Sequence, residues 1–192
     1  MSPIQVIPVS NRKHRIDFFK LRRTLYQQNP AVVFPLNSMA RLQLDTDKHP
    51  FYQHAQREMF VAYVDGKPVG RIAAIIDQMQ QQHNQNQVGC FGFFEAIDDQ
   101  AVVNALISAA ESWLADRGCD QIQGPMDPSM KGEFGVLVDG HEQSPMIMTA
   151  YNLGRYREQL IESGFETVRE FHCYNLYSNN PPDEQWERLL KS

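Results

Sequence analysis

The chain has 192 residues and a net charge of −5 at pH 7, and 42% of its residues are hydrophobic. This length suits one domain with a substantial core, and no apolar run approaches the roughly 18 residues that a membrane span needs. The acidic balance excludes nucleic acid as the main partner, because phosphate binding requires a basic field. Without a secretory signal near the N-terminus, we expect a cytoplasmic protein with no membrane partner.

The first predicted elements are a strand over residues 4–9 and a helix that Ser10 or Asn11 caps. Apolar residues at helical spacing support this helix, namely Phe18, Leu21 and Leu25. Residues 29–55 are irregular and interrupted by prolines, with short helical turns at most.

A β-hairpin follows, with strands over 60–64 and 69–77 and a turn at Asp65-Gly66. The tract QMQQQHNQNQ, residues 78–87, has nothing to bury and predicts a solvated loop. Residues 88–97 are apolar nearly throughout, which indicates a central strand covered on both faces.

The next helix carries an apolar stripe and ends at Gly118. A strand at CDQIQG, residues 119–124, completes a strand-helix-strand crossover over residues 88–124. Residues 125–151 are irregular again, after which Asn152 is expected to cap a helix closed by Gly164. Residues 165–177 alternate like a terminal hairpin.

This order of elements predicts an α+β, mixed α/β domain with a mixed, mostly antiparallel sheet and helices on both faces. We expect one domain over residues 1–178. Residues 179–192 are predicted to be a linker and the start of a helix that leads to a further domain. An exposed C-terminal turn that packs on a partner chain, as in a homodimer, is the alternative.

Several segments resemble the GNAT superfamily of acyl-coenzyme A dependent N-acyltransferases. ESWLADRGCDQI is similar to the end of the family's central helix and its following strand, and NLGRYREQLIESGFE to its last helix. The resemblance covers residues 4–178. FYQHAQREMFVAYVDGKPVGRIAAIID, residues 89–95 and GVLVDG are similar to an uncharacterised bacterial branch of this superfamily.

The family's signature is a turn of the form Arg/Gln-x-x-Gly-x-Gly/Ala, whose backbone N–H groups hold the coenzyme A pyrophosphate. Both glycines and the basic residue are missing here, where the equivalent positions are Asp98, Asp99, Gln100, Ala101, Val102 and Val103. The aspartates are interpreted either as the helix N-cap or as part of a degenerate turn that displaces the phosphates. The resemblance implies acetyl-CoA or another acyl-CoA as cosubstrate.

Glu95 is the candidate catalytic base, because it interrupts an apolar strand and burial would raise its pKa. A buried ion pair with Arg71, which interrupts the neighbouring strand, is the alternative. Tyr156 is the candidate acid by resemblance, although the family's tyrosine position corresponds to Leu160, one turn later. A packed core tyrosine is the alternative reading.

The resemblance also implies backbone contacts to the cosubstrate at Ala96 and Ile97, and at Gln100, Ala101, Val102 and Val103 in the turn. Asn152 resembles the family's asparagine before the last helix, displaced by one residue, and capping is its alternative role. A pocket near the strand ends is expected to use residues of the following loop, namely Asp127, Lys131, Glu133, Asp139 and His141. No spacing typical of metal ligands is present.

Two functions follow from these observations. The first is an acyl-CoA-dependent N-acyltransferase that transfers an acetyl or other acyl group to a small-molecule amine or a peptide. The second is a catalytically inactive binding or interaction module on the same scaffold, as half of a two-domain protein. The acidic turn favours the second function, and the family resemblance favours the first.

Overall fold

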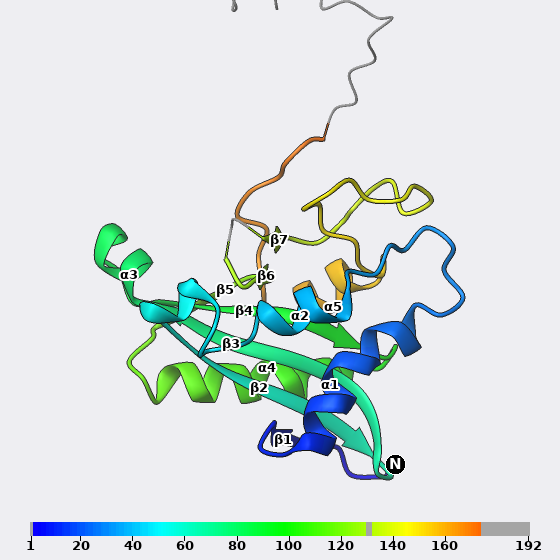
Figure 1. Cartoon of the computed structure of the whole chain (residues 1–192), viewed down its shortest axis with the longest axis horizontal. Coiled ribbons are helices and arrows are strands. Elements are labelled where there is room, and N and C mark those ends of the chain that lie inside the picture. Colours follow the sequence, from blue (N-terminus) through cyan, green and yellow to red (C-terminus); the bar gives the residue numbers. More distant parts are fainter. Residues whose placement is uncertain (1, 130–131, 174–192) are drawn as a thin grey trace, which may run out of the picture.

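The computed structural model describes residues 2–129 and 132–173 (Figure 1). Five strands form one sheet in the order β1-β2-β3-β4-β5, and β6 and β7 form a separate two-stranded sheet. The elements in chain order are β1 (Gln5–Pro8), α1 (Arg12–Leu25), α2 (Asn37–Leu42), a 3-10 turn (Pro50–Gln53), β2 (Ala55–Val64), β3 (Lys67–Asp77), α3 (Gln78–Asn84), β4 (Val88–Ala96), α4 (Gln100–Ala115), β5 (Gln121–Gln123), β6 (Met126–Asp127), β7 (Glu133–Phe134) and α5 (Tyr156–Glu162).

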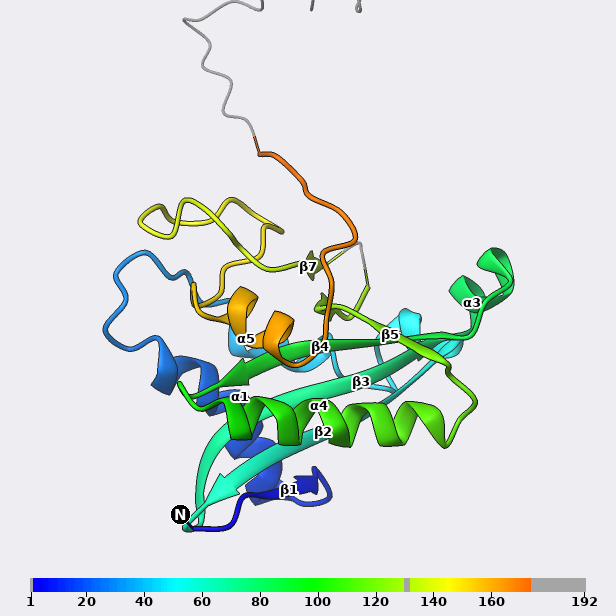
Figure 2. The ribbon, with the colours of Figure 1, turned by 180° about the vertical axis from the view of Figure 1, so that it is seen from behind.

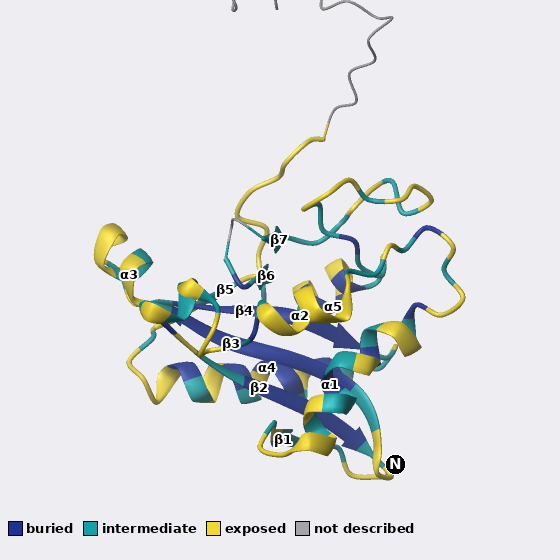
Figure 3. Cartoon of the chain, in the orientation of Figure 1, coloured by how far each residue is buried: buried dark blue, intermediate teal, exposed yellow. Residues whose placement is uncertain are grey.

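Helices cover both faces of the sheet, as the sequence predicts (Figures 1 and 2). The first four strands are antiparallel neighbours, and β5 pairs with β4 in parallel. The helices α1 and α2 lie on one face, and α4 and α5 lie on the other. The central strands are buried almost throughout (Figure 3), which explains their continuous apolar sequences.

The predicted crossover is confirmed, and it leaves an opening in the sheet. Only residues 88–90 of β4 pair with residues 121–123 of β5. Beyond that point the chain turns away at Gly124 and forms β6 and β7. The second half of β4 therefore has no pairing with β5. Glu95 and Ala96 therefore lie at the end of a strand whose neighbour has left the sheet.

A β-bulge in β4 turns the side chains of its last residues to the opposite face of the sheet. Ala73 is opposite Gly92 and Arg71 is opposite Glu95, so β4 has one extra residue between these pairs. Phe93, at φ +51°, lies within this irregularity. Because side chains alternate along a strand, the extra residue turns Glu95 toward α1, on the same face as Arg71.

Two expectations about local structure are wrong. Residues 78–84 form α3 rather than a loop, because the Asp77 side chain accepts hydrogen bonds from the backbone N–H groups of Met79 and Gln80 and glutamine is a good helix former. The first half of the expected terminal hairpin, residues 165–171, contains no strand. Its second half lies largely beyond the described residues, as does the expected linker over residues 179–192.

None of the helices in residues 2–129 and 132–173 is both long enough and apolar enough to cross a bilayer.

Candidate functional site

The site is centred on Glu95, a carboxylate that is only 3% exposed. Its Oε1 lies 3.3 Å from Nε of Arg22 and 3.8 Å from Nη2 of Arg71. Its Oε2 accepts a hydrogen bond of 2.8 Å from the hydroxyl of Tyr156. The two candidates for catalysis, Glu95 and Tyr156, are therefore in direct contact, and the ion pair with Arg71 is also present.

Four elements converge to make this contact. The bulge in β4 turns Glu95 toward α1, whose inner face supplies Arg22 four residues after the fully buried Phe18. Arg71 comes from β3 and donates a hydrogen bond to the Phe18 carbonyl at 3.0 Å. Tyr156, the first residue of α5, approaches from the open edge of β4.

Burial governs the protonation behaviour of these groups. It raises the pKa of Glu95 above its ordinary value, against the attraction of Arg71 and Arg22 and the hydrogen bond from Tyr156. Burial, together with the negative charge of Glu95, also raises the pKa of Tyr156 well above 10. Tyr156 therefore keeps its proton at neutral pH, while Glu95 becomes a better proton acceptor than an exposed carboxylate.

The hydroxyl of Tyr156 also binds a backbone group at the open edge of β4. It accepts a hydrogen bond of 2.9 Å from the Ala96 backbone N–H, and the Ala96 carbonyl accepts a hydrogen bond of 2.8 Å from Nη2 of Arg155. The Ile97 N–H bonds to the Val69 carbonyl at 2.9 Å. The backbone groups of Ala96 and Ile97 that the family resemblance assigns to a cosubstrate are thus engaged within the protein.

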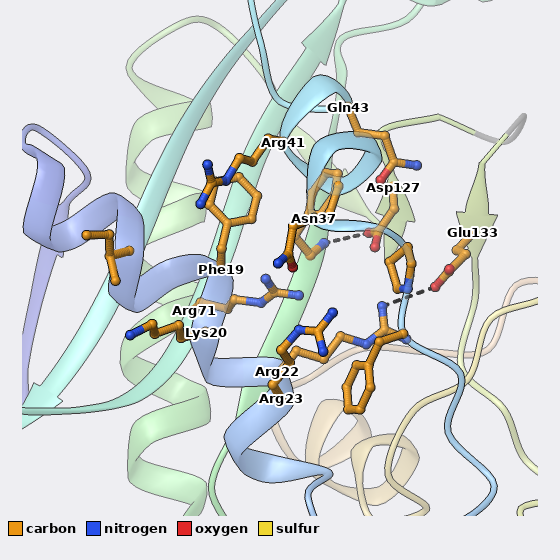
Figure 4. Close-up of a pocket in the computed structure, with 15 residues that line it drawn as sticks. Phe19, Lys20, Arg22, Arg23, Asn37, Arg41, Gln43, Arg71, Asp127 and Glu133 are labelled. Atoms are coloured by element: carbon orange, nitrogen blue, oxygen red, sulfur yellow. Dashed lines mark hydrogen bonds and ion pairs between the residues drawn. The ribbon is translucent and has the colours of Figure 1, made fainter.

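Glu95 lines one cavity, and its partners Arg22 and Arg71 line a second. The first is small, about 30 Å³, and is lined by Glu95, Tyr156, Asn152 and residues of the loop after β5, and this is room for roughly one water molecule. The second, larger one of about 360 Å³ lies between α1, α2 and the sheet (Figure 4). Arg22 lines both cavities, so the buried carboxylate lies between them.

Asp127 and Glu133, which the sequence predicts as pocket residues, lie in both cavities. Oδ1 of Asp127 accepts a hydrogen bond of 2.5 Å from the Phe93 N–H, a group that the bulge removes from the regular strand pairing. Glu133 lies 3.3 Å from Arg22. Neither Asp139 nor His141 lines the two cavities, and Lys131 is not among the described residues.

Asp127 gives a pH-dependent prediction. Burial raises its pKa to about 7, so its proton stabilises the folded state at low pH, and this stabilisation is lost as pH rises from about 4 through 7. Asp127→Asn keeps an oxygen that accepts from the Phe93 N–H but does not titrate. Its free energy of unfolding should therefore fall by about 2 kcal/mol less than that of the unaltered chain as pH rises, allowing for solvent screening. Urea unfolding at pH 5 and pH 8 measures the difference, and an unchanged pH slope would contradict it.

The N-terminus of α4 is occupied by Asp99. Its side chain accepts a hydrogen bond of 2.9 Å from the Ala101 N–H, which confirms the expected cap. The Val102 and Val103 N–H groups bond to the Asp99 carbonyl at 3.1 and 3.2 Å. These amides are therefore engaged, and this turn does not fit a pyrophosphate held in the manner that the family resemblance implies.

Asp98 and Gln100 connect the same turn to α5. Asp98 lies 3.7 Å from Nε of Arg155 and accepts a hydrogen bond from Gln159. The Gln100 side chain donates to the Gln159 carbonyl at 3.0 Å. Both residues therefore hold α4 and α5 together at the open end of the sheet.

Removing the Asp99 carboxylate should open this turn to anions. Asp99→Gly keeps a residue accepted at N-caps, frees the Ala101 N–H, and removes a charge that repels phosphate by about 1 to 4 kcal/mol at close range. We expect acetyl-CoA to bind Asp99→Gly at least about tenfold more tightly than the unaltered chain. Calorimetric titration measures both affinities, with Asp116→Gly, beyond the C-terminal end of α4, as the control. Equal affinities would show that Asp99 does not obstruct the cosubstrate.

The expected helix-capping role of Asn152 is wrong. The helix α5 begins at Tyr156, with Arg155 as its N-cap residue. The Asn152 side chain instead accepts a hydrogen bond from the Leu137 N–H at 2.9 Å and donates one to the Gly135 carbonyl at 3.3 Å. It fixes the loop that forms one wall of the small cavity.

Sequence reasoning missed Arg22 as a member of the site. A basic residue on an amphipathic helix is usually solvated, but Arg22 follows Phe18 by four residues and therefore lies on the same helix face. That spacing is the signal that could have placed it toward the sheet. No comparable signal marks the β4 bulge.

Comparison with known proteins gives two sequence relatives and several solved structures. The chain is 32% identical to a bacterial ceramide synthase of Caulobacter vibrioides over 98% of this chain and 49% of the relative. It is 32% identical to the protein YghO of Escherichia coli over 77% of this chain and 38% of the relative. The chain thus spans about half or less of the length of these relatives. No model of a protein family matches it.

One of the solved structures is that of aminoglycoside N-acetyltransferase AAC(6')-Iy in complex with a bisubstrate analogue of CoA and acetylneamine. The match has a TM-score of 0.52 at 16% sequence identity, over 92% of this chain and 99% of the other. At this identity the match establishes the fold.

Proposed function

Because the chain has the fold of the GNAT acyltransferases, we propose that it transfers an acyl group from an acyl-CoA to an amine. The observation that carries this proposal is the buried pair of Glu95 and Tyr156 at the open end of β4. A base for the amine and an acid for the leaving thiolate are the two groups that direct acyl transfer needs. The small cavity of about 30 Å³ is lined by both residues of the pair.

The proton balance of the reaction suits this pair. The amine nitrogen attacks the thioester carbonyl carbon, so a C–N bond forms and the C–S bond breaks. Glu95 accepts the proton that the amine loses, and Tyr156 gives its proton to the thiolate sulfur. Because the Tyr156 hydroxyl donates directly to Glu95, the proton on Glu95 then replaces the one that Tyr156 has lost.

Arg22 and Arg71 serve this chemistry by holding the carboxylate in place. They also limit the rise in the pKa of Glu95 that burial causes, so that Glu95 can be ionised when the amine arrives.

The sequence relative supports an amide-forming reaction. A ceramide is an amide of a fatty acid with a long-chain amine, so the name of the Caulobacter relative describes N-acylation. We propose the same bond type for this chain, with a small-molecule amine as acceptor. In this proposal the phosphates of the donor bind away from the Asp99 cap; the engaged amides of residues 101–103 support this placement.

Calorimetric titration with acetyl-CoA and palmitoyl-CoA, followed by assays of thiol release with a panel of amines, tests the proposal. Binding of either donor together with amine-dependent thiol release would support it. Absence of binding by both donors would contradict acyl transfer by this chain.

The second candidate function is a binding module that does not catalyse transfer. The observation in its favour is the Asp99 cap, which fills the position where the family binds pyrophosphate. A chain that binds neither donor, even after Asp99→Gly, would fit this function. Amine-dependent thiol release would exclude it.

A further inference from the structure

The cavity of about 360 Å³ between α1, α2 and the sheet is lined by five basic side chains, which is unusual in a chain of net charge −5. They are Lys20, Arg22, Arg23, Arg41 and Arg71. Figure 4 shows these groups around one space, with Asp127 and Glu133 along one side of it. The volume is that of a small-molecule site.

Charge pairing leaves three of the five cations uncompensated. Arg22 pairs with Glu133 at 3.3 Å and with Glu95, and Arg71 also pairs with Glu95. Among residues 2–129 and 132–173, no carboxylate forms an ion pair with the remaining three cations, Lys20, Arg23 and Arg41. They are exposed at the mouth of the cavity.

The floor of the cavity also has an unused donor. Arg71 is 4% exposed, and its Nε makes no hydrogen bond within the described part of the chain. A buried donor without an acceptor is costly, and Figure 4 shows the Arg71 side chain directed into the cavity. A ligand oxygen would satisfy this donor.

The acidic groups of the cavity do not cancel its positive charge. Glu133 is paired with Arg22, and burial raises the pKa of Asp127 to about 7, so it carries only part of a charge at neutral pH. Apart from Asn37 and Gln43, the remaining wall is apolar, with contributions from Ile16, Phe19, Phe34, Pro35, Ala40 and Phe93.

We propose that this cavity binds the anionic group, a phosphate or a carboxylate, of an amphipathic small molecule whose apolar part lies against α1 and α2. Arg71 at the floor and Lys20, Arg23 and Arg41 at the mouth contact the anion. Because Arg22 and Arg71 also hold Glu95, a ligand bound here lies next to the catalytic pair. Its identity as the acyl acceptor rests on the proposed function, whereas anion binding does not.

Calorimetric titration with inorganic phosphate at constant ionic strength tests the anion site. The test variant is Lys20→Gln/Arg41→Gln, whose two side chains are exposed and come from α1 and α2, so the fold should be unaffected. The matched control is Lys67→Gln/Arg157→Gln, which removes the same charges at exposed positions on the β2-β3 turn and α5. We expect the test variant to bind phosphate about tenfold more weakly and the control to match the unaltered chain.

Equal phosphate affinity in the two variants, or no phosphate binding by the unaltered chain, would overturn the anion site. A repeat with saturating acetyl-CoA separates the two sources of the anion. If phosphate still binds at saturating acetyl-CoA, the cavity belongs to a second ligand. If phosphate no longer binds, the donor's own phosphates occupy the cavity, and its assignment to a second ligand is overturned. If neither acetyl-CoA nor palmitoyl-CoA binds while phosphate does, the proposed function fails and the anion site stands.

Discussion

Tyr156→Phe is expected to lower the rate of acyl transfer by about 10²- to 10³-fold, the usual contribution of a general acid or base. The substitution removes the hydroxyl that donates to Glu95 at 2.8 Å and that accepts from the Ala96 N–H at 2.9 Å. The leaving thiolate then has no nearby proton, and the proton on Glu95 has no path to it. Thiol release in the presence of an amine measures the rate.

Glu95→Gln should lower the rate to a similar extent and should also change its pH dependence. Because Glu95 acts when ionised and burial raises its pKa, the rate of the unaltered chain should rise with pH through that pKa. The amide does not titrate, so this rise should disappear in Glu95→Gln. If Glu95 had only a structural role, a folded Glu95→Gln variant would keep the rise in rate with pH. Circular dichroism shows whether the variant is folded.

Tyr63→Phe is the matched control for Tyr156→Phe. Tyr63 is 7% exposed, and its hydroxyl donates to Asp17 at 2.7 Å, away from both cavities of the site. It should lose about 1 kcal/mol of stability and keep its transfer rate. A Tyr156→Phe variant with an unchanged rate would reduce Tyr156 to a packing residue.

Glu95→Ala is expected to lower the free energy of unfolding by about 3 to 5 kcal/mol, because it leaves the buried Arg71 without a carboxylate and Arg22 with Glu133 alone. Arg71 is 4% exposed and the Arg22 side chain 12%, and both contact Oε1 of Glu95. Without the carboxylate, these two positive charges repel each other in a place that water scarcely reaches. Urea unfolding measures the loss.

Glu133→Ala is the control for this stability prediction. Glu133 also pairs with Arg22, at 3.3 Å, but its side chain is 30% exposed, so its removal should cost at most about 1 kcal/mol. A loss for Glu95→Ala no larger than that of Glu133→Ala would show that Arg22 and Arg71 find other partners or water.

Much of the fold follows from local patterns in the sequence. The β2-β3 hairpin was predicted from Asp65-Gly66, and the crossover from the apolar strand, the amphipathic helix and Gly118. These signals are local, since each depends on residues a few positions apart. The strand expected over residues 165–171 is wrong, because alternation of side chains does not by itself make a strand.

The site was predictable in part. Glu95 and Arg71 stand out because each interrupts an apolar strand, and the Asp99 cap follows from its position before a helix. Nothing in the sequence indicates that Arg22 shares the Glu95 carboxylate, or that Tyr156 spans the open edge of β4. Both contacts join residues more than 60 positions apart in the chain.

The sequence by itself thus determined the sheet, its crossover helix and the acidic cap of α4, since period, capping and turn residues act over short distances. Only the tertiary structure decided which way Glu95 faces, because one extra residue in β4 exchanges the two faces of the strand. The same folding gathered five cations from α1, α2 and β3 around one cavity. Such a cluster depends on which segments become neighbours in space. A net charge of −5 for the whole chain gives no indication of it.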